Sequence, residues 1–195
     1  MNSKSIILNK VKKNKPSIES KVELSQFLVD ESDNLIESFV RNLEENDGTY
    51  RLVNSKEELN ELLLKEIEGK SYVNLMETTE LKQHFQSSWL NCPQDLANSK
   101  LLIVRGKLGV AENGAIWVEE EMLQNIRILP FIVERTVFVL SKEKIVPTMH
   151  HAYQNLSGIK TGFGSFIAGP SKTGDIEQNL IIGAHGPLSH LVILY

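Results

Sequence analysis

The segment that decides the fold is Ser165-Phe-Ile-Ala-Gly-Pro-Ser-Lys-Thr-Gly-Asp-Ile-Glu177. Its first four residues, 165–168, form a short apolar run that predicts a buried strand. Gly169-Pro170 then turns the chain, and Asp175 is placed to N-cap a short helix that begins at Ile176. A strand, a polar turn and a helix in this order are typical of α/β proteins, so the segment favours that fold class.

The polar part of this segment is also a candidate ligand site. Ser171, Lys172 and Thr173 offer two hydroxyls and an ammonium, and the free N–H groups of a helix N-terminus favour an anion. The alternative is an ordinary joint between strand and helix, with solvated polar residues. The segment is not a P-loop, because Lys172 precedes Gly174 instead of following a glycine directly.

The composition is that of one globular domain, with 195 residues of which 41% are hydrophobic and 24% charged. A net charge of −4 gives no reason to expect nucleic-acid or membrane partners, and no apolar run reaches the length of a membrane span. Cys92 is the only cysteine, which excludes an internal disulfide and a self-contained iron–sulfur cluster. We therefore expect a cytoplasmic protein with no metal and no cofactor of its own.

The first half of the chain predicts helices and strands in alternation. Residues 1–20 are rich in lysine and poor in apolar residues, so we interpret them as a basic arm and residues 21–195 as a single domain. Ser55 with Glu58 has the spacing of a capping box, and Gly69 suits the C-terminal end of the helix that this box opens. The predicted order is helix 24–43, strand 50–53, helix 55–69 and strand 72–76.

The second half is denser in strands. Pro147 is placed to open a helix that carries His150 and His151, and because adjacent helical residues point in different directions, we predict no metal site there. The segments 108–111 and 115–118 are too close in sequence for a parallel connection, so we expect one antiparallel element within a mostly parallel sheet that is covered on both faces. Apolar runs predict strands at 101–104, 108–111, 115–118, 131–133, 137–140, 180–182 and 191–194.

Two further polar segments interrupt these apolar runs. Glu112-Asn113-Gly114 places a carboxylate and an amide where a ligand can approach the backbone, but Asn-Gly is also a strong hairpin signal, and we favour the hairpin. Gly183-Ala-His185-Gly186-Pro187 places a histidine between glycines after a strand. This histidine is either a candidate for anion binding or proton transfer, or an ordinary loop residue.

These segments carry a family resemblance. Gly169 to Glu177, Gly183 to Pro187 and the terminal strand strongly resemble the C-terminal signature of the lactate-utilisation protein C family, which is the LUD domain. Residues 111–115 are similar to a third family segment, with Asn113 where threonine is usual. The resemblance implies a three-layer α/β/α sandwich around a mostly parallel sheet, as in the sugar-phosphate isomerase and CoA-transferase superfamily. It also implies a part in the oxidation of L-lactate to pyruvate, alongside iron–sulfur partner proteins.

Lactate oxidation moves two electrons, and the sequence has neither a dinucleotide fingerprint nor the cysteines for a cluster. The expected role is therefore that of an accessory, substrate-handling subunit. We expect Glu112 to lie beside the turn at 169–175, in one pocket that binds a small anion such as a carboxylate or phosphate. The candidate ligand-binding residues are Asn113, Gly114, Gly169, Pro170, Ser171, Lys172, Thr173, Asp175, Glu177, His185 and Gly186.

Two other functions fit the same residues. Glu112-Asn113-Gly114 resembles the signature of CoA-transferases, in which a glutamate attacks an acyl-CoA thioester, so Glu112 is a candidate nucleophile. Those enzymes use two such domains, and 195 residues provide one. The third possibility is a non-catalytic module that binds a carboxylate metabolite.

Overall fold

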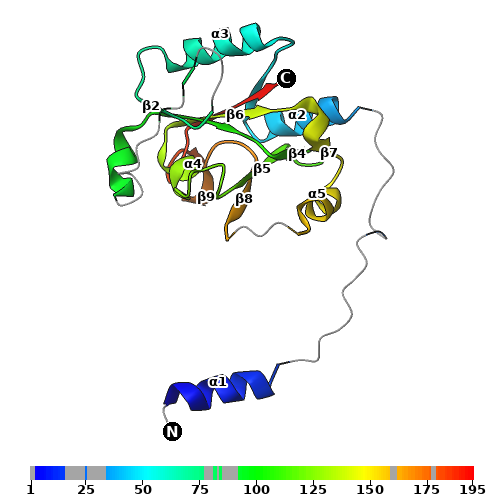
Figure 1. Ribbon diagram of the computed structural model, residues 1–195, viewed down its shortest axis with the longest axis vertical. Coiled ribbons are helices and arrows are strands. Elements are labelled where there is room, and N and C mark those ends of the chain that lie inside the picture. The colour runs from blue at the N-terminus through cyan, green and yellow to red at the C-terminus, as the bar shows by residue number, and fades with distance from the viewer. Residues whose placement is uncertain are drawn as a thin grey trace.

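The computed structural model describes residues 3–15, 25, 34–76, 81–82, 84, 92–158, 162–176 and 179–195. Its centre is a five-stranded sheet in which every neighbouring pair of strands is parallel (Figure 1). In order across the sheet, the strands are β1 (Thr49–Leu52), β11 (Ser189–Leu194), β6 (Arg135–Leu140), β3 (Leu101–Arg105) and β2 (Tyr72–Asn74). The helices are α1 (Ser3–Lys13), α2 (Leu35–Glu45), α3 (Lys56–Ile67), α4 (Leu129–Ile132) and α5 (Met149–Leu156), with 3-10 turns at Pro93–Asn98 and Lys142–Lys144.

The central sheet separates two apolar cores. On β6, Phe138 packs in a core that includes Phe39 of α2, whereas the next residue, Val139, packs in a core that includes Leu63 of α3. Successive residues of a strand point to opposite faces, so α2 and α3 cover opposite sides of the sheet. The expected three-layer α/β arrangement with a mostly parallel sheet is confirmed.

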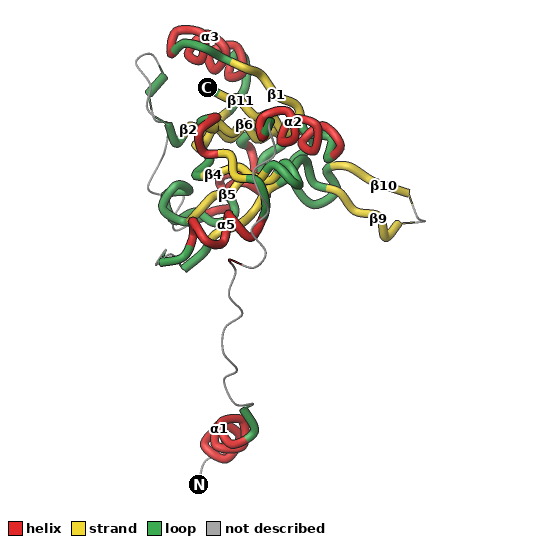
Figure 2. The backbone as a smooth tube through the Cα atoms, turned by 90° about the vertical axis from the view of Figure 1, so that its right-hand side faces the viewer, coloured by secondary structure: helices red, strands yellow, loops and turns green. Residues whose placement is uncertain are grey.

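A second, mixed sheet lies beside α2 and is continuous with the same core. It contains the predicted antiparallel pair, because β4 and β5 form a hairpin across the Glu112-Asn113-Gly114 turn. Its strand order is β7 (Ile145–Val146), β4 (Leu108–Val110), β5 (Ala115–Glu119) and β8 (Gly164–Ile167). A separate hairpin of β9 (Lys172–Ile176) and β10 (Asn179–Ile182) projects from the body (Figure 2).

Several helix ends follow the local sequence signals. The Ser55 hydroxyl accepts the N–H of Glu58 at 3.1 Å, as a capping residue should. The Glu58 carboxylate reaches back to the N–H of Asn54 at 2.8 Å, one residue earlier than the standard capping box. Gly69 has φ +67° just after the end of α3, a conformation that favours glycine.

Three sequence predictions need correction. Asp175 does not cap a helix, because the chain continues as strand β9 to Ile176; Glu177 lies outside the described residues. Residues 131–133 are not a strand, since Pro130 lies in the first turn of the short helix α4, where its fixed φ suits a helix. The strand predicted at 165–168 is present as β8, but it is half-buried because it pairs only with β5 at the edge of the second sheet.

The N-terminal helix α1 is exposed along its length and lies apart from the rest of the described chain (Figures 1 and 2). The predicted helix at 24–43 is present as α2 from Leu35 onward, after the N-cap Asn34; of its earlier part, only residue 25 is described. Among the described residues, no helix has the length and apolar character needed to cross a membrane.

Candidate functional site

Two of the resembling segments meet at Ser171. The N–H of Ser171 donates to the carbonyl of Pro187, and the N–H of Gly183 donates to the carbonyl of Ser171, both at 2.8 Å. A Cβ added at Gly186 would lie 3.0 Å from the Ser171 Cβ, so a glycine permits the close approach. The structure therefore joins the 169–176 and 183–187 segments into one unit, which we call the Ser171 junction.

This junction does not contain the helix N-terminus that the sequence predicted. Both backbone polar groups of Ser171 are engaged within the junction, and Lys172 and Thr173 pair with Ile182 and Ile181 of β10. A strand lacks the cluster of free N–H groups and the aligned dipole that attract an anion to the start of a helix. An anion bound here would therefore not be held by the N–H groups of a helix start.

The side chains of the junction fall into two sets. Lys172 directs its ammonium to Asp47, with Nζ 2.7 Å from Oδ2, whereas Thr173 projects from the opposite face of β9 because successive strand residues alternate. Within the described part of the chain, the hydroxyls of Ser171 and Thr173 have no hydrogen-bond partner. His185 is exposed in the adjoining loop, and Pro170 is buried.

The Glu112-Asn113-Gly114 turn packs against the end of α2. Gly114 has φ +64°, and a Cβ there would lie 2.5 Å from the backbone nitrogen of Leu43. The Asn113 side chain accepts the N–H of Ala115 at 3.0 Å, which closes the turn locally. These contacts give Asn113 and Gly114 a structural role in the hairpin.

Glu112 itself is exposed and faces α5. Its Oε1 accepts the N–H of Met149, the first residue of α5, at 2.7 Å. The N-cap residue Thr148 makes no side-chain cap of its own, because its hydroxyl lies 2.9 Å from Nδ1 of His151. Glu112 therefore supplies the missing cap from another part of the chain.

Asn46 is a shared neighbour of both turns. Its side-chain amide donates to the carbonyl of Asn113 at 3.1 Å. Gly169 has φ +112°, and a Cβ on it would lie 2.3 Å from the Asn46 carbonyl oxygen. The backbone of the Glu112 turn and the Gly169 turn thus reach the same point at the end of α2, while the Glu112 carboxylate is directed to α5.

A buried histidine is not among the site residues predicted from the sequence. His190 on β11 is 1% exposed, and its Nδ1 lies 2.7 Å from the hydroxyl of Thr136. Its Nε2 is buried without a hydrogen-bond partner among the described residues. Burial, followed by the nearby charge of Arg135, lowers the pKa of His190 from 6.5 to about 4, so the imidazole is neutral at pH 7. A polar residue inside an apolar run was the only available signal.

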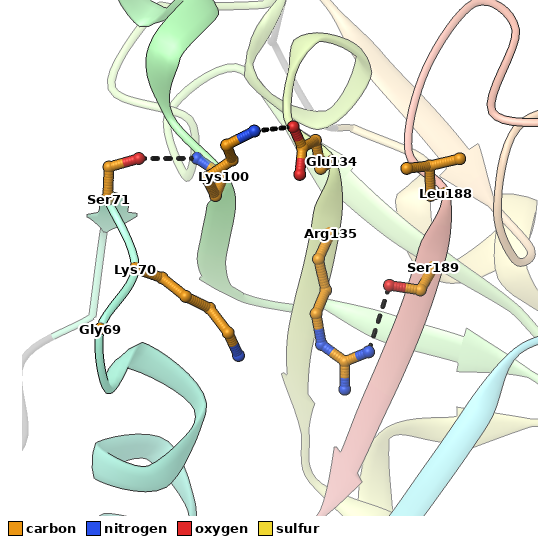
Figure 3. Close-up of a pocket in the computed structure, with 8 residues that line it drawn as sticks. All are labelled: Gly69, Lys70, Ser71, Lys100, Glu134, Arg135, Leu188 and Ser189. Atoms are coloured by element: carbon orange, nitrogen blue, oxygen red, sulfur yellow. Dashed lines mark hydrogen bonds and ion pairs between the residues drawn. The ribbon is translucent and has the colours of Figure 1, made fainter.

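The second feature missed by sequence is a pocket of about 600 Å³ at the amino ends of the parallel strands (Figure 3). Ligands of open α/β sheets usually bind at the carboxyl ends, and these residues lie in four separate segments. Its position adjoins the Ser171 junction, because the N–H of Leu188 donates to the carbonyl of Glu134 one residue after Pro187. The pocket is lined by Gly69, Lys70, Ser71, Lys100, Glu134, Arg135, Leu188 and Ser189.

Metal-ligating side chains do not gather in the part of the chain that the structure describes. No group of three or more His, Cys, Asp or Glu residues there has the geometry to hold an ion. His151 contacts Thr148, and Cys92 is exposed.

Comparison with known proteins supports the family resemblance. The family model described as the LUD domain matches residues 86–195. A lactate utilization protein C from Oceanobacillus iheyensis is 33% identical over 86 residues, which are 41% of this chain and 36% of that protein. The protein of the same name from an Exiguobacterium strain is 32% identical over 113 residues, covering 51% and 48%. The matched segments thus span less than half of these relatives.

A solved structure is similar over almost the whole chain. The crystal structure of a DUF162 family protein from Deinococcus radiodurans covers 89% of this chain and 98% of its own, with a TM-score of 0.55. At 14% sequence identity, this likeness bears on the fold alone.

Proposed function

The chain belongs to the LUD domain family, and from that premise we propose that it serves lactate utilisation as an accessory, substrate-handling subunit. In this proposal, L-lactate is oxidised to pyruvate and the electrons pass to iron–sulfur partner proteins. The oxidation removes two electrons and two protons, so it requires an acceptor. A chain with one cysteine does not supply the four thiolates of a typical cluster.

The observation that carries the proposal is the Ser171 junction. Two separate family segments are hydrogen-bonded into one unit. In it Ser171 lies against Gly186, the neighbour of the exposed His185, and Thr173 follows on the side of the strand opposite Lys172. Hydroxyl and imidazole N–H groups are suitable donors to a carboxylate. We propose that the side chains of Ser171, Thr173 and His185 hold the lactate carboxylate. Lys172 stays in its ion pair with Asp47 on the opposite side of the strand.

Gene deletion in the host organism tests this role. We expect the deletion strain to lose growth on L-lactate and to keep growth on pyruvate, because only the oxidation step is removed. The intact gene should restore growth. The double variant Ser171→Ala with Thr173→Ala should not restore it, whereas the exposed control Ser157→Ala should. Normal growth of the deletion strain on lactate would refute the proposal.

Calorimetry on the purified chain tests whether these side chains bind the carboxylate of lactate. Charge-assisted hydrogen bonds contribute about 1.5–3 kcal/mol each, so the double variant should bind lactate or pyruvate at least about tenfold more weakly than the parent. An absorption spectrum of the same sample should lack a flavin or iron–sulfur band. Either a visible cofactor band or unchanged affinity in the double variant would contradict the assignment.

Acyl-CoA transfer through Glu112 is the second candidate, and the exposure of this carboxylate favours it. The carboxylate would attack the thioester carbonyl and release CoA thiolate, which would then attack the resulting anhydride to leave a glutamyl-CoA thioester and a free acid. Intact-mass analysis after incubation with acetyl-CoA would detect that adduct. If neither the parent nor the Glu112→Gln variant gains mass, acyl-CoA transfer through Glu112 is excluded.

A further inference from the structure

The pocket at the amino edge of the parallel sheet has more cationic than anionic side chains among the ion pairs of the described residues. Glu66 serves two cations at once: it accepts from Arg135 at 3.0 and 3.2 Å, and its carboxylate lies 3.8 Å from the ammonium of Lys70. On the other side of the pocket, Lys100 pairs one-to-one with Glu134 (Figure 3). Three cations therefore face two carboxylates in this part of the described chain.

Donor groups remain available on the same wall. Arg135 has five N–H donors and uses three, since Nε and Nη2 bind Glu66 and Nη1 donates to the Ser189 hydroxyl at 3.1 Å. Because Ser189 accepts that bond, its own proton is free to be donated. Lys70 donates one N–H to the carbonyl of Glu66 at 2.7 Å.

The guanidinium of Arg135 is held in place by its ion pair. The side chain of Arg135 is 28% exposed and that of Glu66 is 18% exposed, so the bidentate pair fixes the guanidinium against the sheet. Glu66 opposes an anion, but both of its oxygens already accept from Arg135. The remaining N–H groups of a fixed guanidinium lose little freedom when they bind a ligand.

We propose that this pocket binds the phosphate group of a small organic phosphate. The guanidinium, the ammonium and the Ser189 hydroxyl are three separate donors, which matches the several terminal oxygens of a phosphate. The cavity of about 600 Å³ is in the size range of drug-sized ligand sites and far exceeds the size of lactate. Leu188, which is 56% exposed on the lining, offers an apolar surface to the rest of the ligand.

Titration of the purified full chain with AMP, adenosine, inorganic phosphate and lactate tests the proposal. We expect AMP and phosphate to bind, AMP more tightly, and adenosine to bind more weakly than AMP. Lys70→Gln should weaken AMP binding by about tenfold, because one charge-assisted contact is lost. Ser189→Ala should weaken it as well, by a smaller factor.

The matched control is Lys65→Gln, which removes the same charge from an exposed residue in the last turn of α3 that does not line the pocket. It should leave AMP affinity unchanged. Both lysines are exposed, so thermal unfolding of each variant should match the parent. The proposal is overturned by absence of AMP binding, by equal weakening in the two lysine variants, or by adenosine binding as tightly as AMP. It stands or falls independently of the lactate assignment, which concerns different side chains.

Discussion

At the scale of single residues, His190 is a titratable side chain that is almost completely removed from water. Desolvation is the larger cause of its lowered pKa, and the neighbouring Arg135 adds to it. The neutral imidazole is compatible with the apolar surroundings, including the Phe138 ring with its centroid 5.2 Å away. Protonation would place an unpaired charge in the core, which is strongly unfavourable.

This environment predicts a pH-dependent stability. Because the folded-state pKa of about 4 lies below the ordinary value of 6.5, the unfolded chain binds the proton first as the pH falls. The free energy of unfolding is therefore not reduced by this histidine above pH 6.5. It decreases as the pH falls from there toward 4. The full shift corresponds to about 3 kcal/mol, of which about 2 kcal/mol is lost between pH 7 and pH 5.

Urea unfolding at both pH values checks this prediction. His190→Gln keeps a polar partner for Thr136 but cannot titrate, so its loss of stability between pH 7 and pH 5 should be smaller than that of the parent by about 2 kcal/mol. Other titrating groups contribute equally to both proteins. Identical pH dependence in the two would show that His190 is not buried as a neutral group.

At the scale of elements, α5 depends on a cap from outside its own sequence. Thr148 is the sequence-adjacent candidate, but Glu112 from the β4–β5 turn accepts the first N–H of the helix. The carboxylate also lies near the positive end of the helix dipole. This contact links the second sheet to α5 and gives Glu112 a structural reason to be acidic.

Replacing this carboxylate should measure the cap. We expect Glu112→Ala to destabilise the protein by about 1 kcal/mol, the usual cost of losing an N-terminal cap. Glu112→Gln keeps an oxygen acceptor and should lose less. The control Glu121→Ala removes an exposed glutamate with no hydrogen bond or ion pair from its side chain among the described residues, and its stability should match the parent. Equal stability of all three variants would argue against the capping role.

At the scale of the whole molecule, the Gly169 turn ties the C-terminal hairpin to the end of α2. The backbone at Gly169 has φ +112°, which side chains rarely adopt, and it lies against the carbonyl of Asn46. The side-chain amide of the same residue, Asn46, donates to the carbonyl of Asn113 in the β4–β5 turn. Three parts of the chain that are distant in sequence therefore depend on one close backbone approach.

A matched pair of glycine substitutions tests that dependence. Gly169→Ala should cost at least about 2 kcal/mol, because it combines backbone strain with a steric overlap against fixed backbone. Gly174→Ala, in the adjacent strand, meets nothing within 4 Å and has no positive φ, so it should lie within about 1 kcal/mol of the parent. Chemical denaturation of the two variants should separate them clearly. Similar stabilities would mean that the turn adapts without cost.

Local patterns predicted much of the fold. The Ser55 cap, the Gly69 helix end and the β4–β5 hairpin each depend on a few consecutive residues, and each is confirmed. Residues 131–133 were misassigned because a short apolar run does not distinguish a strand from a helical turn. Pro130 lies in the first turn of the helix that forms there.

The sequence by itself determined the fold class, most of the order of helices and strands along the chain, and the family segments at 169–177 and 183–187, because periodicity, caps and turns are local properties. Only the tertiary structure decided that Asp175 lies in a strand, since the hydrogen-bond partner of that strand is β10. It also decided that Glu112 caps α5 and that His190 is buried. The cationic pocket is likewise a product of folding, because parallel strands bring together the starts of segments that the sequence keeps far apart.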